Sequence, residues 1–92
     1  MNIVWRPRAA DGFERLIAQA QEANAAAASR DKSLVETRIL QLVRFAELGR
    51  KTRRAGVREL PIEGTPYVVV NHRLGQDILI LRVFHNGKAS LA

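Results

Sequence analysis

Apolar residues in the first part of the chain follow the spacing of an amphipathic helix. A short β-prone segment, residues 3–5, comes before it and ends at Pro7, which has no N–H for a strand ladder but suits the first turn of a helix. Beyond Pro7 the apolar positions fall at i, i+3, i+4 and i+7, which is one face of a helix. They are Phe13, Leu16, Ile17 and Ala20. The pattern predicts a strand and then a helix from Pro7, with Trp5 and Phe13 in the core.

A second helical pattern follows a break at Asn24, where we expect a tight corner because the alanines of residues 25–28 favour helix again. Its apolar positions recur at i, i+4, i+7, i+8 and i+11, and they are Val35, Ile39, Leu42, Val43 and Ala46. Gly49 is the expected end of this helix, because glycine accepts the left-handed conformation of a helix cap. Two helices with so short a connection form an antiparallel hairpin, which needs a sheet to cover its apolar side.

The second half of the chain is rich in β-branched residues and is divided by turn residues. Residues 56–61, 67–73 and 78–84 are predicted strands, because Gly64 and Gly75 mark the turns between them. The first strand must join this sheet through the helical hairpin. The predicted fold class is α+β, in the order β-α-α-β-β-β, with the helical hairpin packed on one face of a twisted, mainly antiparallel four-stranded sheet. One domain spans residues 1–92, and the second face of its sheet is left for water or a partner.

Composition and charge narrow the class of protein and its partners. The 92 residues include no cysteine and are 47% hydrophobic, which excludes disulfide frameworks and disordered chains. The first residues lack the apolar run of a signal peptide, and no run spans a bilayer, so we expect a cytoplasmic protein with no membrane partner. The net charge is +6, and most of it falls in residues 50–92, which carry eight basic and three acidic side chains. A positive surface of this kind suits an anionic partner.

Four cations occupy five consecutive positions between the helices and the sheet. They are Arg50, Lys51, Arg53 and Arg54. Such a run repels itself and stays solvated, so it is either an exposed loop or a patch that contacts phosphates, where each ion pair adds salt dependence. Composition alone leaves both interpretations open.

Arg82 is the charged residue within the most apolar predicted strand. It either pairs, with Glu59 on a neighbouring strand as the candidate, or points out of the uncovered face of the sheet. Alternation along the strand places Arg82 on the side of Ile80 and Phe84 and places His85 on the other side, which weakens any site that uses both.

His72 and His85 are the only side chains that titrate near neutral pH. Neither has companion residues at metal-ligand spacing, so we expect no metal and no cofactor. His72 is expected at an exposed strand end. His85 either caps the sheet edge through a hydrogen bond or contacts a target directly.

Short motifs in a consistent order over nearly the whole chain resemble the ParE/RelE toxin superfamily. They are Trp5, Leu16-Ile17, Asn24, Leu42, Phe45, Leu48-Gly49-Arg50, Arg58-Glu59-Leu60, Tyr67-Val68-Val69-Val70 and Leu81-Arg82-Val83-Phe84-His85. The resemblance implies the same fold that the periodicity predicts. One departure is Ala46, which stands where many relatives carry proline and implies a second helix that runs one turn longer.

The superfamily divides by mechanism, and this sequence is similar to the ParE-like branch, the plasmid stabilisation proteins. RelE-like members cleave mRNA in the ribosome, with an arginine after the tyrosine of the third strand and often a tyrosine near the C-terminus. Here Val68 stands at the first of these positions, and residues 86–92 contain no tyrosine. A nuclease would be left with Arg58, His85 and Lys88, which is a thin set for acid–base catalysis and charge stabilisation.

The resemblance therefore implies a toxin of a type II toxin–antitoxin system that blocks DNA gyrase and has no catalytic residues. Its partner would be a cognate antitoxin whose disordered tail folds on the toxin, and operator DNA would be contacted only through that antitoxin. The expected target-binding residues are Arg82, His85 and Lys88, with the basic run Arg50, Lys51, Arg53 and Arg54. Two alternatives stay open: a ribosome-dependent mRNA endoribonuclease that uses Arg58, His85 and Lys88, and an inactive homologue that only binds its antitoxin.

Overall fold

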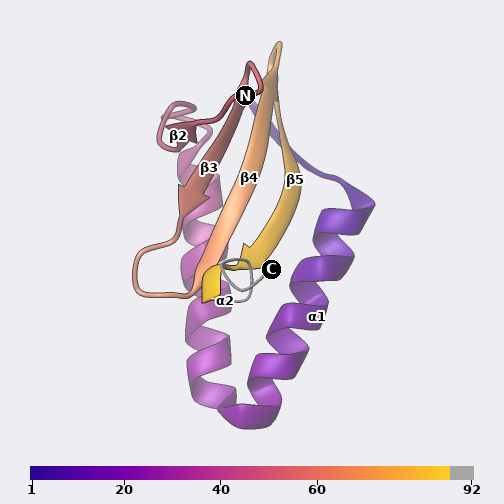
Figure 1. Cartoon of the computed structure of the whole chain (residues 1–92), viewed down its shortest axis with the longest axis vertical. Coiled ribbons are helices and arrows are strands. Elements are labelled where there is room, and N and C mark those ends of the chain that lie inside the picture. The colour runs from indigo at the N-terminus through magenta and orange to yellow at the C-terminus, as the bar shows by residue number, and fades with distance from the viewer. Residues whose placement is uncertain (88–92) are drawn as a thin grey trace.

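The computed structural model describes residues 1–87 as two helices packed against a five-stranded sheet. Along the chain the elements are β1 (Asn2–Trp5), α1 (Pro7–Ala23), α2 (Ala25–Gln41), β2 (Arg50–Lys51), β3 (Val57–Pro61), β4 (Tyr67–Leu74) and β5 (Asp77–His85). The order across the sheet is β1-β5-β4-β3-β2, where β1 runs parallel to β5 and the other neighbours are antiparallel. Both helices lie on one face, with α2 passing behind β3 and β4 in Figure 1. The α+β class and the pairing of the first strand with the last are confirmed.

Asn24 alone makes the corner between the two helices. Its backbone is extended (φ −159°, ψ 100°), and its N–H donates to the Ala20 carbonyl oxygen at 2.9 Å. Its side-chain oxygen accepts a hydrogen bond from the Ala27 N–H at 3.0 Å, so the same residue ends α1 and caps α2. The predicted helix start at Pro7 and the tight corner are both confirmed.

The second helix is shorter than the sequence predicts, because it ends at Gln41 and not at Gly49. The Leu42 N–H donates to the Ile39 carbonyl oxygen, three residues back, at 3.0 Å, so the chain tightens and leaves the helical path. The apolar spacing continues because the turns that follow also pack on the core, where Leu42 is fully buried and Ala46 is partly buried. The longer helix inferred from Ala46 is therefore wrong.

Gly49 allows a close approach of two backbones and does not cap a helix. Of the glycines in residues 1–87, those with positive φ are Gly56, Gly64 and Gly75. A Cβ on Gly49 would lie 2.9 Å from the backbone oxygen of Glu59, so a side chain here would push the segment away from β3.

The chain beyond Gly49 forms a fifth strand where the sequence predicts a loop. β2 pairs antiparallel with β3, with Arg50 opposite Glu59 and Lys51 opposite Arg58. An edge strand needs backbone hydrogen bonds on one side only, and charged side chains are common there because they discourage pairing with other chains. Because the residues of this run are charged, β2 shows no apolar alternation by which a strand could be predicted. The sheet therefore has five strands and not the four that were predicted.

The core lies between the helices and one face of the sheet. Its buried members include Phe13 and Ile17 from α1, Val35 and Ile39 from α2, and Leu60, Tyr67, Val69, Ile78, Ile80 and Val83 from the sheet. Neither α1 nor α2 lies on the other face of the sheet, and we call it the uncovered face.

A bulge in β5 decides which side chains reach the uncovered face. The register passes from Asn71 opposite Ile80 to Val70 opposite Arg82, so Leu81 has no partner in β4 and the alternation shifts by one residue. Ile80 is buried in the core, whereas Arg82 is exposed on the uncovered face. The prediction that these two residues share a face is therefore wrong.

Candidate interaction surfaces

Arg82 points out of the uncovered face, the second of its two predicted alternatives. Its guanidinium carbon lies 4.8 Å from the centre of the Phe84 ring, two residues along the same side of β5. Glu59, the candidate partner, pairs instead with Arg50. A cation–π contact thus holds an exposed arginine over an aromatic ring.

A row of four side chains crosses the uncovered face from β2 to β5. Arg50 lies opposite Glu59, Glu59 opposite Val70, and Val70 opposite Arg82. The Arg50 Nε atom is 3.5 Å from a Glu59 carboxylate oxygen. With neighbouring strands about 4.8 Å apart, Arg50 and Arg82 stand roughly 14 Å from each other. Two cations and one carboxylate leave the row with a positive charge.

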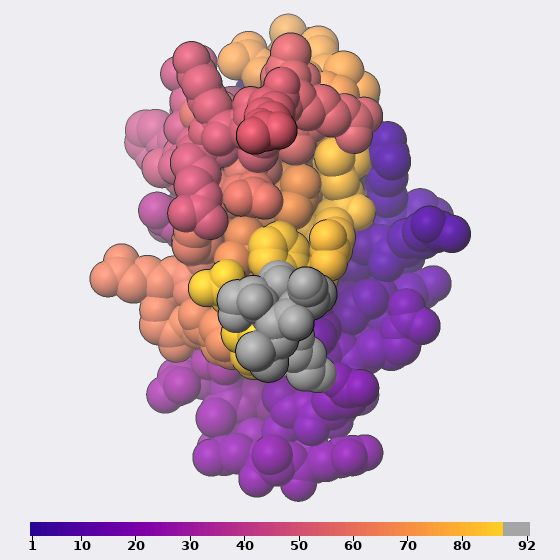
Figure 2. Space-filling model, in the orientation of Figure 1, coloured from indigo at the N-terminus to yellow at the C-terminus, as the bar shows by residue number. Residues whose placement is uncertain are grey.

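The remaining cations of the basic run lie on the hairpin between β2 and β3. Lys51, Arg53 and Arg54 are exposed, and the ion pairs within residues 1–87 involve none of them. Lys51 alternates to the helix side with Arg58. The turn that follows it, residues 52–56, lies over the upper part of the uncovered face, shown in rose in Figure 2. We use the name cationic face for Arg50 and Arg82 of the uncovered face together with the exposed Arg53 and Arg54 of the adjoining hairpin.

Hydrogen bonds fix the shape of this hairpin. The Thr52 hydroxyl lies 3.0 Å from the Val57 carbonyl oxygen and accepts the Arg54 N–H at 3.2 Å. At the end of the turn Gly56 takes a φ of +79°, and a Cβ there would lie 3.1 Å from the His72 ring. His72 is therefore half-buried beneath the turn, and its expected place at an exposed strand end is wrong.

Arg58 ties the segment before β2 to the sheet. Its Nη1 atom donates to the Gly49 carbonyl oxygen at 2.7 Å and to the Glu47 carbonyl oxygen at 3.3 Å. The side chain is half-buried on the helix side of β3, so its guanidinium is engaged by backbone acceptors.

Arg58 and His85 lie at different ends of the sheet. The neighbour of Arg58 on β4 is Asn71, and that of His85 is Tyr67. Four residues of strand separate these positions by roughly 13 Å. Lys88, the third residue of the predicted nuclease set, lies outside the described residues.

His85 closes β5 against the buried ring of Tyr67, with the ring centres 5.8 Å apart and the planes at 88°. Burial raises the pKa of the Tyr67 hydroxyl, and the nearby carboxylate of Asp31 raises it further. Asp31 is only 8% exposed, and its Oδ1 atom lies 3.3 Å from the Arg30 guanidinium. His85 thus joins the end of β5 to the core and keeps part of its surface in solvent.

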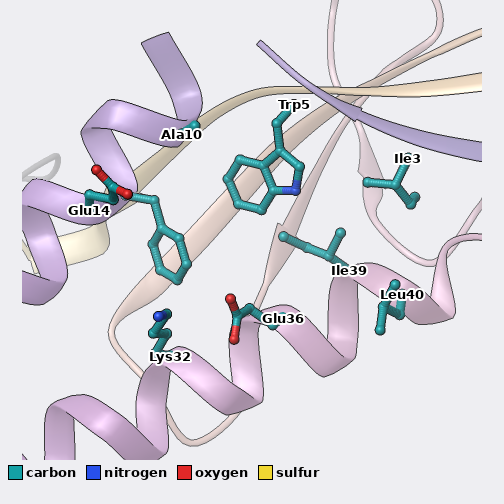
Figure 3. Close-up of a pocket in the computed structure, with 9 residues that line it drawn as sticks. Ile3, Trp5, Ala10, Glu14, Lys32, Glu36, Ile39 and Leu40 are labelled. Atoms are coloured by element: carbon teal, nitrogen blue, oxygen red, sulfur yellow. The ribbon is translucent and has the colours of Figure 1, made fainter. Parts of the chain in front are cut away.

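On the helix side, a groove of about 620 Å³ opens between the two helices and the edge strand β1. Its apolar lining comes from all three elements and includes Ile3, Trp5, Phe13, Ile39 and Leu40. Figure 3 shows the Trp5 ring reaching from β1 into the space between the helices, toward Ile39 on α2. The Trp5 and Phe13 rings stack with their centres 5.6 Å apart, so the groove has a firm aromatic wall.

Charged side chains surround this apolar lining. They are Glu14 from α1 and Lys32 and Glu36 from α2, which together give the rim a net negative charge (Figure 3). An apolar hollow with a polar rim is typical of a surface that binds another molecule.

The sequence analysis missed the groove because it assigned apolar residues at helical spacing to the core. Phe13 and Ile39 are indeed buried, but Trp5 is only partly buried. The available signal was Leu40, an apolar residue outside the predicted helical stripe. It is 64% exposed and lines the groove.

Within residues 1–87, no three histidine, aspartate or glutamate side chains gather as they would around a metal ion. Neither helix of this region is long and apolar enough to cross a membrane.

Comparisons with known proteins agree with this architecture. The family model described as the ParE toxin of type II toxin–antitoxin systems matches residues 3–89. Among solved structures, one of a chromosomal ParDE toxin–antitoxin system from P. aeruginosa is similar, with a TM-score of 0.80 and 23% identity over 92% of this chain and 95% of that chain. A search of curated proteins finds no significant match. At this identity the structural likeness shows the fold alone.

Proposed function

Because the chain belongs to the ParE toxin family of type II toxin–antitoxin systems, we propose that it arrests growth by blocking DNA gyrase and that a cognate antitoxin neutralises it. The observation that carries this proposal is the family match over residues 3–89. The ParE-like branch that the sequence resembles poisons gyrase without cutting RNA.

The placement of the candidate nuclease residues supports a protein inhibitor over an endoribonuclease. General acid–base catalysis needs its groups within hydrogen-bond reach of one reacting centre. Arg58 donates to backbone carbonyl oxygens on the helix side of β3, and His85 packs on Tyr67 at the far end of β4.

The target-binding surface in this proposal is the uncovered face with the end of β5. Arg82 is its centre, because it is exposed and held in place over Phe84. The other proposed contacts are His85 and Lys88, together with Arg50, Arg53 and Arg54 of the basic run. Lys51, the remaining cation of that run, could reach the same target only from the edge of the sheet, because it alternates to the helix side.

A supercoiling assay with purified gyrase and relaxed plasmid tests the target. We expect supercoiling to fall as toxin is added and to recover when the antitoxin is added. Arg82→Gln should weaken the inhibition, whereas Arg15→Gln, which removes the same charge from the exposed side of α1, should not. Normal supercoiling with excess toxin contradicts the proposal.

Two further outcomes identify the alternatives. Cleaved mRNA in a translation extract, with supercoiling unaffected, would indicate an endoribonuclease. Harmless expression with neither effect would indicate an inactive homologue that only binds its antitoxin.

The antitoxin occupies the groove between α1, α2 and β1 in this proposal. The acidic residues of the rim, Glu14 and Glu36, give no attraction to an acidic tail, so apolar side chains on the antitoxin must supply the affinity. Trp5 and Leu40 are the available anchors, since both line the groove and keep surface to bury.

Leu40→Glu tests the groove without disturbing the core, because the leucine is 64% exposed. Without the apolar contact between Leu40 and the antitoxin, the binding free energy should weaken by about 1–2 kcal/mol, which raises Kd roughly 5- to 30-fold. Leu74→Glu is the matched control, because Leu74 is 50% exposed and lies outside the groove lining. If calorimetry shows that the Leu40→Glu variant binds the antitoxin as tightly as the wild type does, the groove is not part of the interface.

A further inference from the structure

Three cations of the cationic face are left without an acidic partner by the fold. Residues 50–59 contain five basic side chains and one acidic side chain, Glu59, which pairs with Arg50. Arg53, Arg54 and Arg82 are exposed and take part in no ion pair within residues 1–87. Exposed cations without an acidic neighbour in this region leave the surface available to an anionic partner.

We propose that the cationic face binds the phosphate backbone of duplex DNA and does not read its bases. The hairpin that carries Arg53 and Arg54 is already ordered by Thr52 and by the hydrogen bond from the Arg73 N–H to the Gly56 carbonyl oxygen, so little conformational freedom is lost on binding. A two-stranded ribbon can enter the major groove, which is about 12 Å wide.

The spacing of the charges also fits a duplex. Arg50 and Arg82 stand roughly 14 Å apart across the uncovered face, which is comparable to the width of the major groove. Cations at both ends of one row can then meet phosphates on the two sides of the groove. Contacts of this kind fix position and carry no sequence information.

The aromatic residues favour a duplex over single-stranded RNA. Single strands are held by bases stacked on open aromatic rings. The phenylalanine on the uncovered face, Phe84, is occupied by Arg82. Trp5, Phe13 and Tyr67 belong to the groove and the core. Phe45 is 60% exposed but lies on the segment between α2 and β2. A face with cations and no free ring suits phosphates better than unpaired bases.

This inference goes beyond gyrase inhibition and does not depend on it, because the experiment uses the toxin and DNA alone. Fluorescence anisotropy with a labelled duplex of about 20 base pairs measures Kd at several salt concentrations. Three to four phosphate contacts predict a slope of about −2.7 to −3.6 for log K against log salt, or roughly 40- to 150-fold weaker binding at 200 mM than at 50 mM.

The double variant R53Q/R54Q should reduce the slope by about 1.8, so that the same change in salt weakens binding only about 3- to 12-fold. The control R8Q/R15Q removes two exposed cations from α1 and should leave the slope unchanged. Both variants change exposed side chains, so both should fold, and circular dichroism checks this.

Three results would overturn the proposal. One is the absence of measurable binding to the duplex at about 50 mM salt. Another is an equal loss of slope in R8Q/R15Q, which would mean that net charge alone is responsible. The third is tighter binding to a single-stranded RNA of the same length, which would make the surface an RNA-binding one. None of them bears on whether gyrase is inhibited.

Discussion

Replacing Arg58 with glutamine separates a structural role from a catalytic one. The guanidinium donates to the carbonyl oxygens of Gly49 and Glu47, at 2.7 and 3.3 Å, and so holds the segment before β2 against the sheet. Arg58→Gln removes the charge and shortens the side chain, which leaves both carbonyl oxygens without this donor. We expect loss of stability, with loss of toxicity only in proportion to it.

The expected loss of stability follows from the two hydrogen bonds that Arg58 donates. A hydrogen bond from a charged donor contributes about 1.5–3 kcal/mol, but the second bond is long and Arg58 is only half-buried, so water offsets part of the loss. A net loss of about 1–2 kcal/mol is expected, which lowers the Tm of a domain of this size by roughly 5–12 °C.

Thermal and urea unfolding followed by circular dichroism measure this loss, and a growth assay on the same variant measures toxicity. Arg53→Gln is the control, because Arg53 is exposed and should change stability by less than about 0.5 kcal/mol. If Arg58→Gln keeps the Tm of the wild type and abolishes growth arrest, Arg58 acts on the target and the structural account is refuted.

Other substitutions test the packing and the buried tyrosine. Gly49→Ala should lower the free energy of unfolding by about 1–3 kcal/mol, because its Cβ would lie 2.9 Å from a backbone oxygen of β3. Gly12→Ala, in the middle of α1 with open space around it, should raise that free energy by about 0.5–1 kcal/mol, and chemical denaturation compares the two. Because the pKa of Tyr67 is raised in the folded state, the native protein retains that proton at a pH where the unfolded chain has lost it. The free energy of unfolding should therefore be unaffected below the ordinary tyrosine pKa of 10.0 and should fall as the pH rises further. The Tyr67→Phe variant should lose less stability over this alkaline range. If the variant and the wild type lose equal stability there, Tyr67 is not the group responsible.

The sequence predicted most of the sheet because turn chemistry limits where strands can lie. Gly64 and Gly75 both take positive φ, and the strands on either side begin and end within a few residues of the predicted bounds. The corner at Asn24 was found because the apolar spacing breaks there while the alanines that follow favour helix again. These features depend on residues close together in the chain.

The errors arise where contacts distant in sequence decide the conformation. The end of α2 at Gln41 depends on how Leu42 and the following turn pack on the core, and apolar spacing does not register that change. The bulge at Leu81 depends on the register with β4, and it alone moves Arg82 away from Ile80. Candidate residues could thus be chosen from the sequence, whereas the surface they share could not.

The candidate surfaces lie on different sides of the sheet, and this separation gives their variants opposite phenotypes. Leu40 lines the groove on the helix side, while Arg53 and Arg54 are exposed on the hairpin beside the uncovered face. If the antitoxin binds the groove, Leu40→Glu should stay toxic and resist neutralisation, because its target-binding face is intact. R53Q/R54Q should be less toxic and still be neutralised, because its groove is intact. A groove variant that loses toxicity while it remains folded would place the target on the helix side, since no charge of the cationic face has been changed.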